Sequence, residues 1–293
     1  MAKGLFENLG RIYMKKLITL NTHSIVEKNY EEKLELFIDM ILAEQPDVIA
    51  LQEVSQRIIS DVVEVTHPYY IPCEADTVFH PENHALRVAN MLSERGVPYY
   101  WSWASIKVSY DTYDEGVAIF CKKKPEDIKS VWVSHNKFFE DWAARKALGV
   151  CVDGTWYYSI HTGWWDDKRE PFKDHWDCLR TAAKESCGKD GLCFIMGDFN
   201  SPADVRDQGY DYVINTGWYD TYQLAKRKDV GTTAFRKIDG WAERLQEGMA
   251  REDGLRIDYI WCNQPIEIFQ SEVIANGVNY PIMSDHFGVK IQF

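Results

Sequence analysis

The hydrophobic pattern near the start of the chain predicts a strand, a helix and a second strand. Residues 16–20 read as a first strand, and the apolar residues within 34–42 recur at the spacing of one helix face. Pro46 should end that helix, since proline cannot continue it. Residues 47–54 then read as a strand with Glu53 at its end. This succession indicates a layered α/β or α+β fold.

The same pattern predicts further elements along the chain. A helix over residues 85–92 would be closed by Gly96 in a left-handed cap, and Pro171 can occupy the first turn of another helix. Residues 231–238 are weakly patterned and receive no assignment. Runs rich in aromatic and β-branched residues, or apolar throughout, predict the remaining strands at residues 99–108, 116–121, 147–152, 156–160, 192–196, 256–261 and 288–293.

The strand at residues 192–196 is central, because polar groups follow it directly. Gly197 would permit a close backbone approach or an unusual turn, and Asp198 and Asn200 come next. Side chains two apart on an extended segment point the same way, so both groups could converge on one ligand. The alternative is ordinary turn chemistry, for which Gly-Asp-x-Asn is equally suitable.

Length and composition favour a single domain without a membrane span. The chain has 293 residues, 45% of them hydrophobic, and no Pro/Gly/Ser-rich linker or internal repeat. Residues 1–13 precede Met14 and are interpreted as an added leader, so the expected domain covers residues 14–293. No apolar stretch reaches the roughly 20 residues needed to cross a bilayer, and no secretion signal is seen. A soluble, cytoplasmic protein is expected.

Cysteine usage indicates the cellular compartment of the protein, and its net charge indicates the kind of partner. The seven cysteines include no Cys-x-x-Cys pair, as expected for reduced thiols in the cytosol. The formal net charge is −12, and no basic cluster is visible along the sequence. Because proteins that hold nucleic acid neutralise its phosphates with lysine and arginine, this charge argues against a nucleic-acid partner. Folding could still assemble a basic surface, and the oligomeric state is left open.

Polar residues capable of binding a metal recur at predicted strand ends. In layered α/β folds ligands gather at strand ends, so these side chains are expected to meet at one edge of the fold. A mixture of carboxylate and amide oxygens with two imidazoles suits Mg²⁺, or Mn²⁺, better than a thiolate-bound metal. The residues are Asn21, Glu53, Glu115, His161, Asp198, Asn200, Asp258, Asp285 and His286.

Seven short motifs occur in order from about Leu17 to the C-terminus. They are Thr19-Leu20-Asn21, Leu51-Gln52-Glu53, Glu115-Gly116-Val117-Ala118-Ile119, Ile160-His161-Thr162, Gly197-Asp198-Phe199-Asn200, Ile257-Asp258-Tyr259-Ile260 and Ser284-Asp285-His286. Each alone is weak, but together they resemble the endonuclease/exonuclease/phosphatase superfamily. The resemblance implies a DNase I-like four-layer α/β/β/α sandwich, in which two packed mixed β-sheets are flanked by helices and the site lies at one rim.

The resemblance also implies roles for the strand-end residues. Glu53 would be the principal metal ligand, with Asn21 and Asp285 completing the shell directly or through water. Asp198 would orient or deprotonate the attacking water, and Asn200 would hold a phosphoryl oxygen. Phosphate ester hydrolysis needs such groups, because charge must be offset, a nucleophile positioned and the leaving group protonated. Glu53 could instead be a helix or turn cap.

Two histidines complete the implied constellation. His286, oriented by Asp258, would donate to the phosphate as charge builds. His161, paired with Glu115, would protonate the leaving alkoxide or stabilise the transition state. Structural alternatives stay open, because His161 could be a satisfied core imidazole and Asp258 could simply pair with Arg256. Three other histidines lack such a context and are interpreted as structural or surface residues: His23, His135 and His175.

The motifs indicate the type of bond that is hydrolysed, whereas the aromatic residues indicate the kind of substrate. Flat aromatic faces pack against the C–H surfaces of a sugar, and tryptophans in the predicted loops suggest such faces near the rim. Residues 17–24, 163–165, 219–222 and 238–241 carry a narrower resemblance, to the maltose 6′-phosphate phosphatases of Gram-positive bacteria. This resemblance implies that the substrate is an imported disaccharide phosphate. It also implies that Trp164, Trp165 and Trp241 contact the sugar and that Arg145 or Lys168 meets the phosphate as a cation.

Two alternative functions use the same residues. A nuclease or other phosphodiesterase would need the same site, and a long basic groove on the folded surface would favour it. A catalytically inactive binding module should have lost some of the strand-end groups, all of which are present. The favoured expectation is a Mg²⁺-dependent phosphomonoesterase for a small-molecule phosphate ester.

Overall fold

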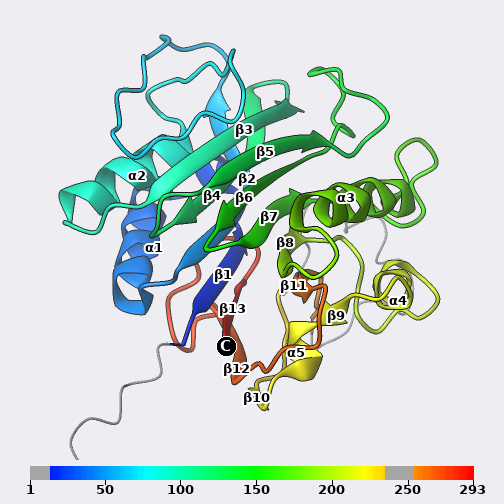
Figure 1. Cartoon of the computed structure of the whole chain (residues 1–293). Helices are drawn as coiled ribbons and strands as arrows, with labels where there is room; N and C mark the ends of the chain where they lie inside the picture. Colours follow the sequence, from blue (N-terminus) through cyan, green and yellow to red (C-terminus); the bar gives the residue numbers. More distant parts are fainter. Residues whose placement is uncertain (1–13, 235–253) are drawn as a thin grey trace, which may run out of the picture.

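The computed structural model describes residues 14–234 and 254–293, which form two β-sheets and their covering helices (Figure 1). The first sheet contains β1 (Lys16–Asn21), β2 (Val48–Arg57), β3 (Tyr100–Ser109), β4 (Tyr113–Cys121), β10 (Arg227–Lys228), β12 (Gln270–Ile274) and β13 (Gly288–Gln292). The second contains β5 (Asp127–Trp132), β6 (Lys146–Val152), β7 (Thr155–His161), β8 (Cys193–Asp198), β9 (Tyr219–Asp220) and β11 (Asp258–Cys262). The helices are η1 (Ser24–Val26), α1 (Tyr30–Glu44), α2 (His84–Glu94), α3 (Phe172–Cys187), α4 (Gly209–Asn215) and α5 (Thr221–Leu224).

Both sheets are mixed. The first has the strand order β10-β12-β13-β1-β2-β4-β3, in which β1 and β2 are parallel and β13 is antiparallel to β1. The second has the order β5-β6-β7-β8-β11-β9, in which β7 and β8 are parallel and β11 is antiparallel to β8. The described residues thus confirm the predicted α/β/β/α sandwich of two packed mixed sheets.

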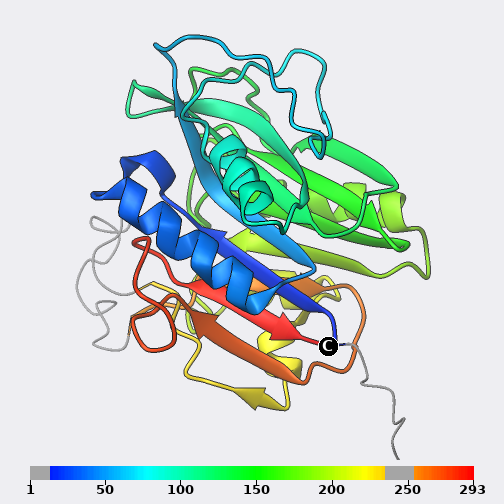
Figure 2. The same ribbon diagram turned by 90° about the vertical axis from the view of Figure 1, so that its left-hand side faces the viewer.

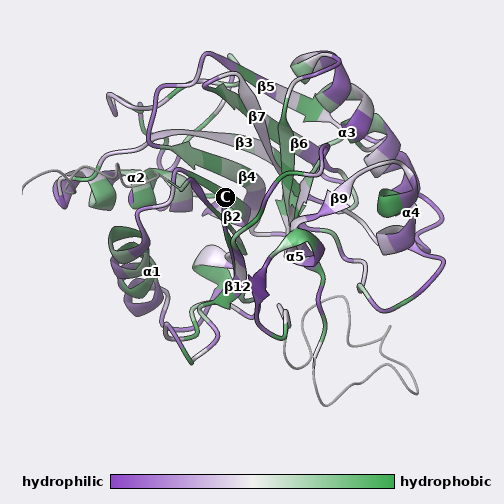
Figure 3. Cartoon of the chain, turned by 60° about the horizontal axis from the view of Figure 1, so that its bottom comes forward, coloured by the Kyte–Doolittle hydropathy of each residue, from purple (hydrophilic) through white to green (hydrophobic). Residues whose placement is uncertain are grey.

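Three apolar layers hold the sandwich together, as expected when each sheet buries both faces. Helices α1 and α2 lie along the outer face of the first sheet (Figure 2), and their apolar residues pack there. Helix α3 covers the second sheet, and Figure 3 shows apolar colour along the strands of both sheets. Representative residues of the layer between the sheets are Val48, Ile119, Leu148, Phe194 and Ile260, all at most 1% exposed.

Polar contacts also cross between the two sheets near the ends of their central strands. Gln52 on β2 donates from Nε2 to Ser159 Oγ on β7 at 3.0 Å. The Ser159 hydroxyl donates in turn to the carbonyl of Leu51 at 3.0 Å. Asn21 Nδ2 on β1 lies 3.2 Å from Asp198 Oδ2 on β8. Since buried polar groups require partners, these bonds favour one alignment of the sheets.

The predicted elements agree with the observed ones at the core and fail at the edges. Helices α1, α2 and α3 and the central strands were predicted within a few residues. Strands β5 and β12 and helix α4 were not predicted, because β5 has no buried residue, β12 begins with three polar residues and α4 has only seven residues. The prediction that the second strand ends at Glu53 is wrong, since β2 continues to Arg57 through a bulge.

Other expectations can be compared only in part. None of the described helices combines the length and apolar character that a bilayer-crossing segment requires. All seven cysteines are free thiols. The expected leader at residues 1–13 and the predicted sugar contact Trp241 lie outside the described residues, so these two expectations stay predictions.

Candidate active site

The ends of β1, β7, β8 and β11 meet at one rim of the sandwich, beside a bulge in β2. Residue pairing in the second sheet places His161 and Asp258 on either side of Asp198. In the first sheet, β1 ends with Asn21, which pairs with Gln52 immediately before Glu53. The strand ends therefore gather the polar residues as the sequence predicts.

These residues surround a pocket with a volume of about 240 Å³. Its lining brings together most of the predicted site residues with four that were not predicted, Lys107, Ser109, Tyr110 and Trp142. The predicted residues in the lining are Glu53, Glu115, Arg145, His161, Trp164, Asp198, Asn200, Asp285 and His286. Asn21 and Asp258 contact this lining from behind, through Glu53 and His286 respectively.

Glu53 reaches the pocket because β2 is interrupted by a bulge. The pairing with β4 shifts register between Leu51 and Val54, and Glu53 takes a positive φ of 52°. Ser24 supports this turn, since its hydroxyl donates to the Glu53 carbonyl at 2.6 Å. Bulges redirect a side chain at a strained backbone position, which explains how a mid-strand residue can serve the site.

Gly197 and Asn200 shape the segment around Asp198. Gly197 has φ 149°, and a Cβ there would overlap the carbonyl oxygen of Ile160 on β7. Asn200 has φ 44° and donates its backbone N–H to Asp198 Oδ1 at 2.8 Å. The prediction that both side chains reach one pocket is correct, but the alternation argument behind it is wrong. A left-handed turn, not an extended strand, brings Asn200 beside Asp198.

Asp198 lies between the two imidazoles and is 2% exposed. Its Oδ2 is 3.5 Å from His161 Nε2 and 3.7 Å from His286 Nε2. Burial raises the pKa of Asp198 to about 7, although His286 opposes this shift. A carboxylate with a pKa near neutrality can accept a proton from water and release it again, as a general base must.

His286 is held by Asp258. Its Nδ1 donates to Asp258 Oδ2 at 2.9 Å, which leaves Nε2 facing Asp198 and the pocket. Burial would lower the pKa of His286, but the charges of Asp258 and Asp198 outweigh burial and raise it well above its usual value. The alternative pairing of Asp258 with Arg256 is not found, because Arg256 Nη1 lies 2.8 Å from Asp220.

The pairing of His161 with Glu115 is not found. Glu115 Oε1 lies 3.2 Å from the ammonium of Lys107, which competes with the imidazole for this carboxylate. Asn200 Nδ2 donates to His161 Nε2 at 3.0 Å. The His161 Nδ1 atom is buried without a hydrogen-bond partner among the described residues and lies 3.8 Å from Glu53 Oε1. Burial, with the charges of Arg145 and Lys107, holds the pKa of His161 well below its usual value.

The pocket contains the donor set of a divalent-cation site. Burial, together with the charges of Glu115 and Asp285, raises the pKa of Glu53 to about 7, although His23 and the hydrogen bond from Asn21 oppose this shift. One oxygen or nitrogen from each of Glu53, His161 and Asp198 lies within 4.8 Å of the others. Carboxylate oxygens with an imidazole fit Mg²⁺ or Mn²⁺. Asn21 donates from Nδ2 to Glu53 Oε1 at 2.8 Å, so it orients that carboxylate here.

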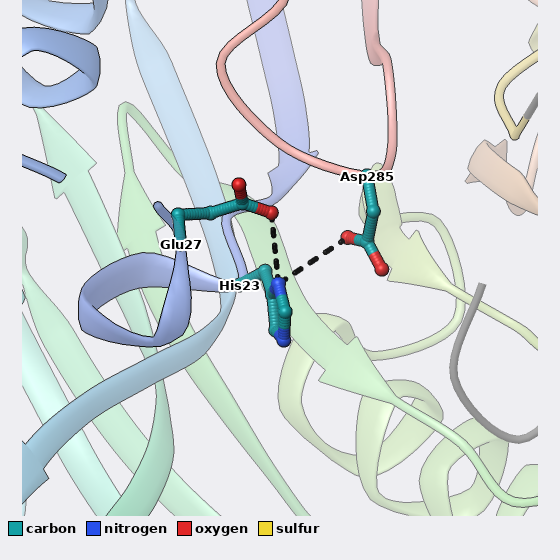
Figure 4. A group of neighbouring side chains, drawn as sticks. All are labelled: His23, Glu27 and Asp285. Carbon is teal, nitrogen blue, oxygen red and sulfur yellow. Dashed lines mark hydrogen bonds and ion pairs between the residues drawn. The ribbon is translucent and has the colours of Figure 1, made fainter. Parts of the chain in front are cut away.

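His23, interpreted from the sequence as structural or surface, lies beside this site (Figure 4). Its Nδ1 is 2.8 Å from Glu27 Oε1 and 3.9 Å from Asp285 Oδ1. Burial opposes protonation, but the hydrogen bond to Glu27 and nearby carboxylates raise the pKa of His23 to about 9. An imidazolium here holds Asp285 against the loop after β1. Its position two residues beyond Asn21 was the available signal.

The predicted substrate contacts divide into two groups. Trp164 lines the pocket, and its ring centroid is 6.0 Å from that of Trp142. Trp165 packs on Phe172 instead, away from the pocket lining. Lys168 is exposed and is not in the lining either. Trp164 and Trp165 are thus adjacent in one loop but only Trp164 lines the pocket, and two residues of the same type gave no basis in the sequence for that difference.

Four lining residues escaped prediction, and two of them left a signal. Lys107 interrupts a strand of tryptophan, alanine and isoleucine, where a charge needs a partner or a function. Trp142 precedes Arg145 closely and is 48% exposed, unusual for so large an apolar ring. Tyr110 is 53% exposed and sits in a tight turn with φ 49°. Ser109 has no distinguishing pattern.

Two packed mixed sheets with this pocket at their common rim define a protein of the DNase I-like class. The Endonuclease/Exonuclease/phosphatase family model matches residues 18–286, and the chain belongs to that family. Members are generally hydrolases, with phosphatases and nucleases among them. Comparison with curated proteins gave no match.

Solved structures with the same fold include phosphatases. An endonuclease/exonuclease/phosphatase family protein from Leptotrichia buccalis is 26% identical, with a TM-score of 0.81 over 94% of this chain and 98% of that one. A mannosyl-6-phosphatase from Bacteroides thetaiotaomicron is 15% identical, with a TM-score of 0.63 over 95% and 99%. A 3′ phosphatase from Neisseria, bound to a product DNA hairpin, is 19% identical, with a TM-score of 0.60 over 95% and 99%. The last two show the fold alone.

Proposed function

We propose that the chain is a metal-dependent phosphomonoesterase that acts on a small sugar phosphate, such as maltose 6′-phosphate. One observation carries the proposal: the buried Asp198 carboxylate lies between two imidazoles and beside Glu53, in a pocket with aromatic walls. The carboxylates and imidazoles supply what hydrolysis of a phosphate ester needs. The aromatic walls suit the non-phosphate part of a sugar substrate.

Glu53 and Asp285, with Asn21 beside them, would hold the metal ion. When bound, the ion would polarise a phosphoryl oxygen and offset its charge. Asp198 would take a proton from the attacking water as the new oxygen–phosphorus bond forms and the bond to the sugar oxygen breaks. Asn200 would position a phosphoryl oxygen.

The two histidines offer donors from opposite sides of Asp198. Asp258 holds His286 through Nδ1, so that Nε2 faces the pocket. Asn200 donates to Nε2 of His161, which directs the proton of the neutral ring to Nδ1. Either group can stabilise charge on the phosphate or return a proton to the leaving sugar alkoxide. Kinetics of single variants at His161 and His286 would assign the two roles.

The aromatic walls support a sugar as the leaving group. Trp142 and Trp164 face the same pocket with their rings close together, and Tyr110 is at its edge. The net charge of −12 does not suit a polyanion such as DNA. A disaccharide fits the expectation from the sequence, and a cytoplasmic location is proposed with it.

Phosphate release with Mg²⁺ should be measured on maltose 6′-phosphate, glucose 6-phosphate, an inositol phosphate and abasic duplex DNA scored for nicking. We expect release from the disaccharide phosphate to be fastest. EDTA should abolish it, and added Mg²⁺ or Mn²⁺ should restore it. Nicking of DNA without phosphate release from any monoester would refute the proposed function and identify a nuclease. An activity insensitive to EDTA would refute metal dependence.

A further inference from the structure

Two cationic side chains are buried at the pocket, on the side formed by β3 and the segment before β6. Lys107 is 7% exposed and Arg145 is 3% exposed, and both line the pocket. Burying a charge is costly unless it is paired. Lys107 has Glu115 at 3.2 Å, whereas Arg145 has no carboxylate within ion-pair distance in the part of the chain that the structure describes. Arg145 is thus a buried cation without its own counter-charge.

The hydrogen bonds of Arg145 leave one edge of the guanidinium for a ligand. Nη1 donates to the carbonyls of Trp142 and Ala144, at 2.8 and 2.9 Å. The buried Nε has no hydrogen-bond partner among residues 14–234 and 254–293. The Nε–H and an Nη2–H lie side by side on the opposite edge, in the planar fork that matches two oxygens of a phosphate.

Lys107 joins Arg145 at the same backbone oxygen. Its Nζ donates to the Trp142 carbonyl at 3.0 Å, so one oxygen receives bonds from both cations and holds them close together. An ammonium has three N–H donors, of which the Trp142 carbonyl and Glu115 account for two. The indole of Trp142, on the same residue, is half exposed at the pocket. Trp142 therefore links the two cations, through its carbonyl, to the aromatic wall, through its indole.

We propose that Lys107 and Arg145 bind the doubly charged terminal oxygens of a phosphomonoester and thereby select monoesters over diesters. This inference rests on the proposed function, whose substrate class it specifies. A monoester carries close to two negative charges at neutral pH, as a phosphorylated side chain does, whereas a diester carries one. Four carboxylates line the same pocket and repel a dianion: Glu53, Glu115, Asp198 and Asp285. Two cations, in addition to the metal that the pocket would hold, offset that repulsion, and a diester gains less from them.

The test compares 4-nitrophenyl phosphate with bis(4-nitrophenyl) phosphate at pH 8 and saturating Mg²⁺. Since a hydrogen bond to a charged group is lost, Lys107→Met should lower kcat/KM for the monoester about 10- to 100-fold. The diester should lose no more than about 3-fold, because it lacks the second charge. The inhibition constant of inorganic phosphate should rise with the monoester effect. Lys124→Met, at an exposed lysine, is the matched control and should change none of these values.

A second variant separates charge recognition from folding, because Lys107→Met leaves Glu115 buried without a partner. Lys107→Met/Glu115→Gln removes both charges, and it should fold, as judged by circular dichroism, and still lose the monoester preference. Equal losses on the two esters in a folded variant, or an unchanged phosphate inhibition constant, would overturn the inference and leave the proposed function standing. A wild-type protein that cleaves only diesters would overturn both.

Discussion

Replacing Gly197 with alanine tests whether the close contact between β7 and β8 requires glycine beside Asp198. The Cβ of alanine would overlap the carbonyl oxygen of Ile160, and it would lie 3.2 Å from Gln52 Nε2. The φ of 149° is also one that residues with a side chain rarely adopt. The backbone conformation costs about 1–3 kcal/mol and the overlap costs about 1–3 kcal/mol more. We therefore expect Gly197→Ala to lower the free energy of unfolding by about 4 kcal/mol.

Urea unfolding, followed by tryptophan fluorescence, measures this loss, and Gly154→Ala is its control. Gly154 has φ 71°, but an added Cβ meets nothing within 4 Å. That variant should lose only the left-handed penalty, about 1–2 kcal/mol. The difference between the two variants isolates the contact with Ile160. Equal losses in both variants would refute the claim that this contact requires glycine.

Three further predictions concern catalysis, recognition and pH. Asp198→Asn should lower turnover about 10²- to 10⁴-fold, because the proton acceptor is lost. Circular dichroism should show that the variant is still folded, and turnover close to that of the wild type would remove Asp198 from the mechanism. Trp142→Ala should raise KM for the preferred sugar phosphate about 10-fold with little change in phosphate inhibition, since the backbone carbonyl remains; an unchanged KM would exclude ring stacking. Burial lowers the pKa of His84 to about 3, below the 6.5 of the unfolded chain, so its contribution to stability is complete above pH 6.5 and is lost as the pH falls. Between pH 6 and 5, His84→Gln should therefore reduce the slope of the unfolding free energy against pH by about 1 kcal/mol per pH unit. Urea unfolding at each pH measures this slope, and a slope equal to that of the wild type would contradict the account.

The strong periodic patterns of the core strands and helices predict a layered α/β or α+β fold, and the resemblance carried by the seven motifs implies the sandwich itself. The apolar spacing within α1 and the alternation around Asp258 depend only on neighbouring residues, so they can be read without a structure. Strand β12 begins with three polar residues, and no local pattern predicts its pairing with β13. Elements of this kind are fixed by tertiary contacts.

The candidate site was also predicted only in part. The identity of the carboxylates and imidazoles follows from motifs, but their partners depend on backbone turns that leave little trace in sequence. The bulge at Glu53 and the left-handed turn at Asn200 are examples. A second bulge, between Ser105 and Lys107, precedes the residue that takes Glu115 away from His161. Trp164 and Trp165 are adjacent and chemically identical, so only packing assigns one to the pocket and the other to Phe172.

The polar contacts between the two sheets have a mechanical consequence. Glu53 belongs to one sheet and Asp198 to the other, so the spacing of the reacting groups is set by how far one sheet has slid over its neighbour. The contacts of Gln52 with Ser159 and of Asn21 with Asp198 resist that sliding. Substitutions in the apolar layer between the sheets would then lower turnover by shifting Glu53 relative to Asp198, without contacting the substrate. Turnover would therefore respond to displacements of one sheet over the other that are smaller than those that unfold the chain.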